Sequence, residues 1–307
     1  MTNARHGLHV VQLDTGHRMR GGQWQVFQLM EELRRMGVSQ TLLAPGGSPL
    51  LEKVEAAGFE AAPISMAALW RQAHRANLIH AHDARAHNMA ALFRSRLRPL
   101  IVSRRVAFPV RRSWLSRWKY ARAKLYIAVS RYVERQLIAA GVPADRIVVV
   151  PDGVRLPEES GGGGSVVLAL NSSDPGKCGQ LIRAAGRAAG VDIRFSTDLN
   201  RDLPGAAVFV YISSSEGLGS AALLAMAHGV PVIASRTGGL PEAVENEVSG
   251  LLTENDASAI AACLRRLLDG EPLRRRLGAQ ARERVMDLFT IQKTAAGTLS
   301  AYEKALA

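Results

Sequence analysis

Short runs of hydrophobic residues alternate along the chain with segments whose hydrophobic positions recur every three or four residues. The run over 8–14 reads LHVVQLD, and the segment over 22–37 places Val26, Leu29 and Leu33 on one side. The first pattern is typical of a buried strand and the second of an amphipathic helix. We expect further strands over 39–44, 60–65, 78–82, 100–104, 125–130, 146–151, 165–170, 191–196, 207–213, 230–235 and 250–253. We expect further helices over 48–57, 66–75, 84–96, 113–123, 131–141, 178–189 and 220–228, from Pro241, and over 257–268, 271–288 and 291–306.

This alternation predicts an α/β protein with parallel sheets covered by helices on both faces. A chain of 307 residues favours two domains, and a proline- and glycine-rich stretch ending in GGGGS interrupts the alternation. We therefore predict two doubly wound, Rossmann-like domains facing each other across a cleft. The expected parts are a first domain over 1–155, a linker over 156–165, a second domain over 166–290, and a helix over 291–307 that crosses back to the first domain. GGGGS is typical both of a native glycine run and of an engineered linker, and both interpretations stay open.

The composition indicates an ordinary globular protein, with 47% hydrophobic and 21% charged residues. No apolar run reaches the roughly 18 residues of a membrane span, and the first residues lack the pattern of a secretory signal. Cys178 and Cys263 are the two cysteines and show neither a disulfide framework nor metal-ligand spacing. We expect a soluble, cytoplasmic protein without a metal.

The net charge of +12 is concentrated in one segment, because no Asp or Glu occurs between Ala84 and Val133. Trp114 and Trp118 lie four positions apart within it and would share a helix face. Such a segment favours a partner with phosphate groups, although a solvated basic surface is the ordinary alternative. We predict no nucleic-acid partner, since no recognised motif accompanies the charge. The predicted role is docking to an anionic membrane through Arg111, Arg112, Trp114, Arg117, Trp118 and Lys119.

One acidic residue, Glu216, stands among glycines in front of an uncharged helix. A strand that ends in a glycine-rich turn and feeds a helix presents free backbone N–H groups and a positive dipole end to an anion. Gly217 and Gly219 would let the backbone approach a pyrophosphate or a sugar closely. A solvent-facing Glu after an ordinary glycine turn is the simpler interpretation.

The stretch 213–252, SSSEGLGSAALLAMAHGVPVIASRTGGLPEAVENEVSGLL, resembles the donor-binding segment of family 4 retaining glycosyltransferases, which have the GT-B fold. Supporting matches are GG at 21–22, HAHD at 80–83, and the stretch 125–154, so the resemblance covers nearly the whole chain. It implies transfer of a sugar from a nucleotide sugar to a lipid-linked or cell-surface polysaccharide acceptor, with retention of the anomeric configuration. It also implies a place in cell envelope biosynthesis, peripheral to the inner face of the cytoplasmic membrane. The leaving diphosphate helps to deprotonate the acceptor in this family, so no metal or other cofactor is expected.

The resemblance also assigns roles to single residues. Glu216 matches a family residue that contacts the transferred sugar, and His82 matches a histidine near the reacting sugar, where imidazole can donate to a hydroxyl or to the leaving phosphate. A strand-end histidine is also a common structural residue, and His80 on the same strand face is expected in the core. The residues matched to donor binding are Gly21, Gly22, Lys177, Gly217, Leu218 and Gly219.

Three departures from the family pattern converge on the donor site. Leu224 stands where a second Glu usually holds the donor ribose, and Ser172 stands where an Arg usually precedes the lysine. The interval from Lys177 to Glu216 is about half the usual length, as if one strand–helix unit were absent. The alternative function is therefore a catalytically weak or inactive glycosyltransferase-like binding protein at the membrane.

Overall fold

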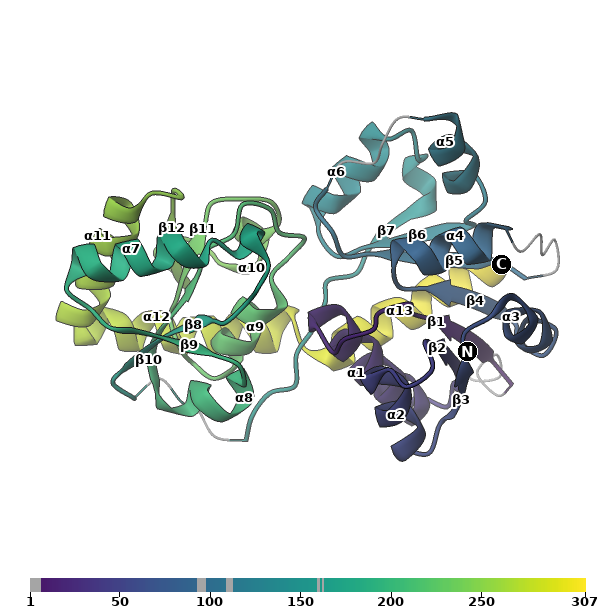
Figure 1. Ribbon diagram of the computed structural model, residues 1–307, viewed down its shortest axis with the longest axis horizontal. Coiled ribbons are helices and arrows are strands. Elements are labelled where there is room, and N and C mark those ends of the chain that lie inside the picture. The colour runs from purple at the N-terminus through teal and green to yellow at the C-terminus, as the bar shows by residue number, and fades with distance from the viewer. Residues whose placement is uncertain (1–6, 93–97, 109–112, 159–160, 162) are drawn as a thin grey trace. The chain divides into compact units, whose positions relative to one another are not determined.

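The computed structural model describes residues 7–92, 98–108, 113–158, 161 and 163–307. The chain forms two compact units, Met1–Pro151 with Ile291–Ala307, and Asp152–Thr290 (Figure 1). The first stretch of the first unit thus ends at 151 rather than at the expected 155, and the expected linker over 156–165 falls within the second unit. The reason is local pairing, because Val154 forms a bridge with Thr290 and the Gly161 amide donates to the His228 carbonyl at 2.7 Å.

A sheet of seven parallel strands forms the first unit, in the order β3-β2-β1-β4-β5-β6-β7. Its strands are β1 (His9–Leu13), β2 (Ser39–Ala44), β3 (Glu60–Pro63), β4 (Leu78–Ala81), β5 (Leu100–Arg104), β6 (Leu125–Ala128) and β7 (Ile147–Val149). Its helices are α1 (Gly21–Arg35), α2 (Pro49–Ala56), α3 (Met66–Ala73), α4 (Ala84–Leu92), α5 (Trp114–Tyr120), α6 (Arg131–Ala139) and α13 (Ile291–Leu306). The strand order reverses between β1 and β4, which makes the carboxyl ends of these two strands the place where such sheets bind ligands.

The C-terminal helix α13, drawn in yellow in Figure 1, belongs to the first unit by its packing. Leu299 and Tyr302 of this helix lie in one buried cluster with Leu29 of α1 and residues of β1, β4, β5 and β6. A Cβ on Gly297 would come within 2.9 Å of Val150, so glycine allows the helix to approach the chain after β7. The segment over 291–307 therefore completes the core of the first unit.

The second unit contains five parallel strands in the order β12-β11-β10-β8-β9. These are β8 (Val166–Leu170), β9 (Ile193–Ser196), β10 (Ala206–Tyr211), β11 (Val232–Ser235) and β12 (Gly250–Thr253). The helices are α7 (Gly179–Ala189), α8 (Leu199–Asp202), α9 (Ser220–Ala227), α10 (Leu240–Ala243), α11 (Ala257–Asp269) and α12 (Glu271–Leu288). In this sheet the order reverses between β8 and β10. The expected doubly wound α/β fold is confirmed in both units, and the one-turn helix α8 is an addition to the expected elements.

The apolar composition of α9 matches its position. Ala222, Leu223, Ala225, Met226 and Ala227 are all buried, as expected for a helix that is hydrophobic on all sides. Over the described part of the chain, no helix has the length and apolar character needed to cross a bilayer.

Candidate functional site

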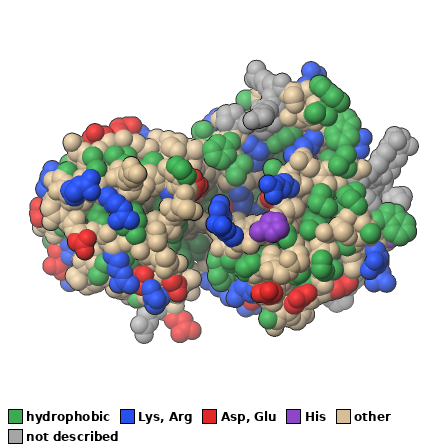
Figure 2. Space-filling model, in the orientation of Figure 1, with side chains coloured by type: hydrophobic (Ala, Val, Ile, Leu, Met, Phe, Trp, Pro, Cys, Tyr) green, Lys and Arg blue, Asp and Glu red, His purple; other side chains and the backbone are tan. Residues whose placement is uncertain are grey.

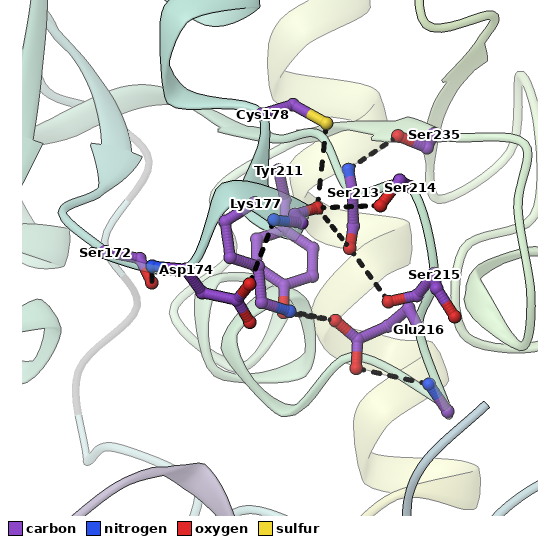
Figure 3. Close-up of polar contacts among 12 residues, drawn as sticks. Ser172, Asp174, Lys177, Cys178, Tyr211, Ser213, Ser214, Ser215, Glu216 and Ser235 are labelled. Atoms are coloured by element: carbon purple, nitrogen blue, oxygen red, sulfur yellow. Dashed lines mark hydrogen bonds and ion pairs between the residues drawn. The ribbon is translucent and has the colours of Figure 1, made fainter. Parts of the chain in front are cut away.

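Two loops that follow adjacent strands of the second unit bring Lys177 and Glu216 together, although 39 positions separate them in the sequence (Figure 3). Lys177 follows β8 and Glu216 follows β10, so both lie at the carboxyl edge where the strand order reverses. The Lys177 Nζ and the Glu216 Oε2 form an ion pair, and the two side chains are only 21% and 15% exposed. The structure therefore places the predicted phosphate-binding cation in direct contact with the predicted sugar-binding carboxylate.

The backbone before α7 aims Lys177 at this point. The Asp174 carboxylate accepts from the Gly176 amide at 2.9 Å and starts a 3₁₀ turn over Pro175–Lys177. Cys178 then adopts a left-handed conformation with φ 50°, and α7 begins at the next residue. The lysine thus ends a short turn in front of the helix, and its ammonium reaches Glu216.

A second network holds the loop that carries Glu216. The Ser213 amide donates to the Ser235 Oγ at 2.8 Å, the Ser235 Oγ donates to the Asn255 Oδ1 at 2.6 Å, and the Asn255 Nδ2 donates to the Ser213 carbonyl at 3.1 Å. The amide of Gly239 donates to the Glu216 carbonyl at 2.9 Å. These bonds fix the loop by its backbone. The Glu216 Oε1 accepts from the Gly217 amide at 3.2 Å, and the Oε2 faces the lysine.

The predicted donor-binding glycines have separate structural reasons. Gly219 precedes α9 with φ +106°, and a Cβ there would lie 2.7 Å from Leu240, so both the backbone angle and the space require glycine. Gly217 and Leu218 are buried beside it. Gly21 and Gly22 open α1 in the first unit, and a Cβ on Gly22 would meet no described atom within 4 Å. Packing within the unit therefore does not explain the glycine at 22.

In the first unit, His82 directly follows β4 and is 6% exposed. Its Nε2 donates to the Gln12 Oε1 at 2.7 Å, and its Nδ1 accepts from the Arg105 guanidinium at 3.2 Å. The Gln12 side chain turns its Oε1 toward His82, because the Nε2 of the same amide donates to the Gln40 Oε1 at 2.9 Å. Burial, with His80 and Arg105 nearby, holds the pKa of His82 well below its ordinary value. His82 is thus a neutral imidazole with both nitrogens occupied, and a direct bond to a sugar or phosphate stays a prediction.

The expectation that His80 belongs to the core is confirmed. Its Nδ1 contacts the Tyr302 hydroxyl at 2.8 Å and its Nε2 contacts the Ser103 hydroxyl at 2.8 Å. The ring lies 4.0 Å from the His82 ring between centroids. His80 therefore links α13 to the strands that carry the candidate residues of this unit.

Sequence reasoning missed several residues at these strand ends. Asp14 follows β1, accepts from the Gly16 amide at 2.8 Å and from the Gln23 side chain at 3.1 Å, and burial is the main cause that raises its pKa. Thr15 donates to Asp83 through its amide at 2.6 Å and its hydroxyl at 2.7 Å. A polar residue directly after a hydrophobic run was the available signal. These bonds tie the loop before Gly21 to the end of β4.

Tyr211 was missed in the second unit. It is the last residue of β10, and its hydroxyl lies 2.7 Å from both the Lys177 Nζ and the Glu216 Oε2. Its sequence signal was weak, because an aromatic residue at a strand end is common.

The predicted docking segment is only partly described, since Arg111 and Arg112 lie outside the described residues. Trp114 is 75% exposed on α5, and Trp118 has the Arg122 guanidinium 4.0 Å from its ring centroid. Figure 2 shows hydrophobic side chains at the surface of the first unit over α5, with basic side chains beside them. Arg117 is exposed, but the Lys119 ammonium donates to the Ala84 carbonyl at 3.1 Å. The Lys119 ammonium is therefore directed toward α4 rather than outward into solvent.

Within the described residues, no group of three or more His, Cys, Asp or Glu side chains could hold a metal ion. The expectation that the protein works without a metal or other cofactor stays a prediction.

Comparison with known proteins identifies related families in both units. A model of "Glycosyltransferase Family 4" matches residues 19–157, and a model of "Glycosyl transferases group 1" matches residues 193–284. The MMP alpha-(1->4)-mannosyltransferase of Mycolicibacterium hassiacum is 45% identical over 94 residues, which cover 30% of this chain and 23% of that protein. The D-inositol 3-phosphate glycosyltransferase of Saccharomonospora viridis is 33% identical over 199 residues, which cover 55% of this chain and 45% of that protein. These matches span less than half the length of the curated relatives.

The fold is shared with a solved structure over nearly its full length. Anabaena HepE, solved in complex with UDP and glucose, superposes with a TM-score of 0.83 at 18% identity, covering 97% of this chain and 100% of the HepE chain. The two family models, the paired parallel sheets and this likeness agree with one another. The chain belongs to glycosyltransferase family 4 and has the GT-B fold.

Proposed function

We propose that this protein transfers a sugar from a nucleotide sugar to a lipid-linked or cell-surface polysaccharide acceptor, with retention of the anomeric configuration. The observation that carries the proposal is the meeting of Lys177 and Glu216 at the carboxyl ends of β8 and β10. A diphosphate is recognised by a cation, and the hydroxyls of a sugar are recognised by a carboxylate. One nucleotide sugar contains both groups, joined by a single bond.

The reaction breaks the bond between the anomeric carbon and the diphosphate oxygen. The acceptor hydroxyl forms the new bond on the same face of the sugar, its proton passes to the departing diphosphate, and a nucleoside diphosphate leaves. In this scheme Lys177 stabilises the charge that develops on the diphosphate, and Glu216 orients the sugar. The leaving group serves as the base, so the scheme assigns no cofactor and no covalent nucleophile.

The comparisons support the choice of donor. HepE was solved with UDP-glucose as well as with UDP and glucose, and two of the matched relatives are named as a mannosyltransferase and an inositol 3-phosphate glycosyltransferase. UDP sugars are therefore the donors to screen first, and GDP sugars are screened beside them.

Calorimetric titration with UDP, GDP and their sugar conjugates tests the proposal. Lys177→Ala is expected to weaken both the nucleotide and the nucleotide sugar by about tenfold, the usual scale for one charge-assisted contact. Glu216→Gln is expected to weaken the nucleotide sugar relative to the bare nucleotide. The surface ion pair of Arg266 and Glu247 lies in the same unit, so Arg266→Ala and Glu247→Gln are matched controls that should bind like the wild type.

Absence of nucleotide binding by the wild type would refute the donor site. With a donor that binds, NMR of the product reports the anomeric configuration, and an inverted product would refute retention.

A specific observation also supports the alternative, a weak or inactive binding protein. Leu224 is only partly buried on α9, so the position is accessible but offers no acceptor for a ribose hydroxyl. The Ser172 hydroxyl accepts from the Asp174 amide at 3.1 Å and supports the turn before Lys177. Nucleotide binding without measurable transfer, and gain of affinity in Leu224→Glu, would favour this alternative.

Attachment to the inner face of the cytoplasmic membrane is part of the proposal. An acceptor embedded in a bilayer requires the protein to approach anionic headgroups, and α5 presents Trp114 and Leu115 at 75% and 58% exposure in a segment without acidic residues. Indole rings favour the headgroup region, and nearby cations are attracted to it.

A further inference from the structure

Tyr211 is held firmly between the two candidate donor-binding residues (Figure 3). It is 4% exposed, and its ring stacks on Phe209 with centroids 5.9 Å apart and planes 17° apart. The Lys177 Nζ lies 4.8 Å from the centre of the Tyr211 ring. A side chain packed on one face and covered by a cation on another has little freedom to move.

The Tyr211 hydroxyl has one proton, and the geometry decides where it goes. Lys177 can only donate, so the hydroxyl accepts from the Nζ at 2.7 Å and donates to the Glu216 Oε2 at 2.7 Å. Burial and the neighbouring Glu216 raise the pKa of Tyr211 well above its ordinary value, so the hydroxyl stays protonated. The same carboxylate oxygen thus has two partners, a cation that could move and a hydroxyl that cannot.

We infer that Tyr211 is a positioning residue of the donor site, whose hydroxyl keeps Glu216 in place when Lys177 leaves it for a diphosphate. The inference rests on the proposed function. It follows that the Lys177–Glu216 ion pair opens on binding and therefore competes with the diphosphate for the lysine. Tyr211 lowers the penalty of opening, because the Oε2 of the partly buried carboxylate retains its hydrogen bond from the hydroxyl, beside the bond from the Gly217 amide to the Oε1.

This competition for Lys177 predicts that loss of the negative charge of Glu216 improves the binding of UDP. Glu216→Gln keeps the shape of the side chain but releases the ammonium, so UDP should bind about fivefold more tightly than to the wild type, as expected for one ion pair. Tyr211→Phe should weaken UDP by a similar factor, because the Glu216 Oε2 would then have neither Lys177 nor the hydroxyl on binding, and only the Oε1 would keep its bond from the Gly217 amide at 3.2 Å. The phenyl ring retains the stacking on Phe209 and the contact with Lys177.

A double-mutant cycle separates positioning from simple packing. In the Glu216→Gln background, Tyr211→Phe should leave UDP affinity unchanged, because a neutral amide does not need the hydroxyl during binding. A tyrosine needed only for its packing would leave UDP affinity unchanged in both backgrounds, because phenylalanine keeps the ring, and a hydroxyl that acts independently of Glu216 would weaken UDP equally in both. The test is calorimetry with UDP on the four proteins of the cycle, with Glu247→Gln as a control for the loss of one negative charge elsewhere in the unit.

A second cycle separates pairing from long-range repulsion. In the Lys177→Met background, Glu216→Gln should no longer tighten UDP, whereas repulsion between Glu216 and the diphosphate would persist. Unchanged or weaker UDP binding by Glu216→Gln, with normal binding by the wild type, would overturn the inference alone. A wild type that binds neither UDP nor GDP would overturn the proposed function, and the inference with it.

Discussion

Three buried histidines of the first unit show how single residues shape its response to pH. His80 and His82 are enclosed in hydrogen bonds, and the pKa of each is held well below its ordinary value, mainly by burial. His87 of α4 packs against the rings of Tyr120 and Tyr126, and burial lowers its pKa to about 3. All three are neutral when the protein is folded at neutral pH. On unfolding, each returns to a pKa near 6.5 and takes up a proton below it.

This difference predicts acid sensitivity with a definite sign. Between pH 6.5 and about 3 the unfolded state binds more protons than the native state, so the free energy of unfolding falls as the pH falls. His87→Phe preserves the aromatic packing and removes one such group. Between pH 6 and 4 the free energy of unfolding of this variant should fall less steeply than that of the wild type. The two slopes should differ by about 1.4 kcal/mol per pH unit. Urea unfolding at several pH values checks this, and equal slopes would contradict it.

His82 gives a second prediction at this scale. His82→Ala leaves the Gln12 Oε1 without its donor inside the first unit and removes one acceptor of Arg105, so stability should fall by about 2 kcal/mol. The exposed His17 is the control, since His17→Ala should leave stability within about 0.5 kcal/mol of the wild type. Unchanged stability in His82→Ala, together with lost turnover, would show that the imidazole acts on the substrate instead.

At the scale of elements, the short helix α5 differs from the other helices of the first unit because none of its residues is buried. Its N-cap is Ser113, which accepts from the Ser116 amide, and its last turn carries Arg117 and Lys119. A helix with so little buried surface has a weak packing reason to carry two tryptophans. A membrane surface would supply the missing environment for both rings.

We therefore predict that the protein sediments with anionic vesicles but not with neutral ones, and that high salt reverses the binding. Trp114→Ala with Trp118→Ala should weaken the binding by about tenfold, through loss of buried aromatic area. Trp70 on α3 is 60% exposed in the same unit, and Trp70→Ala is the matched control with unchanged binding. Equal binding to neutral vesicles would argue against docking, as would salt-sensitive binding to DNA with none to lipid.

At the scale of the whole molecule, the chain leaves the first unit at Pro151 and returns to it at Ile291. The returning helix α13 supplies Leu299 and Tyr302 to the core, and the Tyr302 hydroxyl bonds to His80 at 2.8 Å. The first unit is therefore complete only after the second has been synthesised. Its folding depends on residues from both ends of the sequence.

Removal of residues 291–307 should expose this core and make the truncated chain aggregate. The finer test is Tyr302→Phe, which keeps the ring but leaves His80 and Gln12 without the hydroxyl and should lower stability by about 1–2 kcal/mol. Leu306 is 45% exposed on the same helix, and Leu306→Ala is the control with little effect. Thermal unfolding compares the variants, and an unaltered Tyr302→Phe would show that the hydroxyl is not needed.

The order and type of the elements could be predicted from the sequence alone, because strands buried on both faces are continuously hydrophobic and the helices between them are periodic. The residues at strand ends could be predicted too. Lys177, Glu216 and Gly219 stand in turns that join strands to helices, and the carboxyl ends of parallel strands meet at one edge.

Only the tertiary structure decided which side chains meet at that edge. Periodicity places Lys177 and Glu216 after their strands, but the order β10-β8 makes those strands neighbours, and the ion pair and the bridging Tyr211 follow from it. The occupied nitrogens of His82 depend likewise on Gln12 and Arg105, which are distant in sequence. Hydrogen bonds of this kind depend on differences of a few tenths of an ångström in the spacing between elements. A hydrophobic pattern contains no information on that scale, because it records only which face of each element is buried.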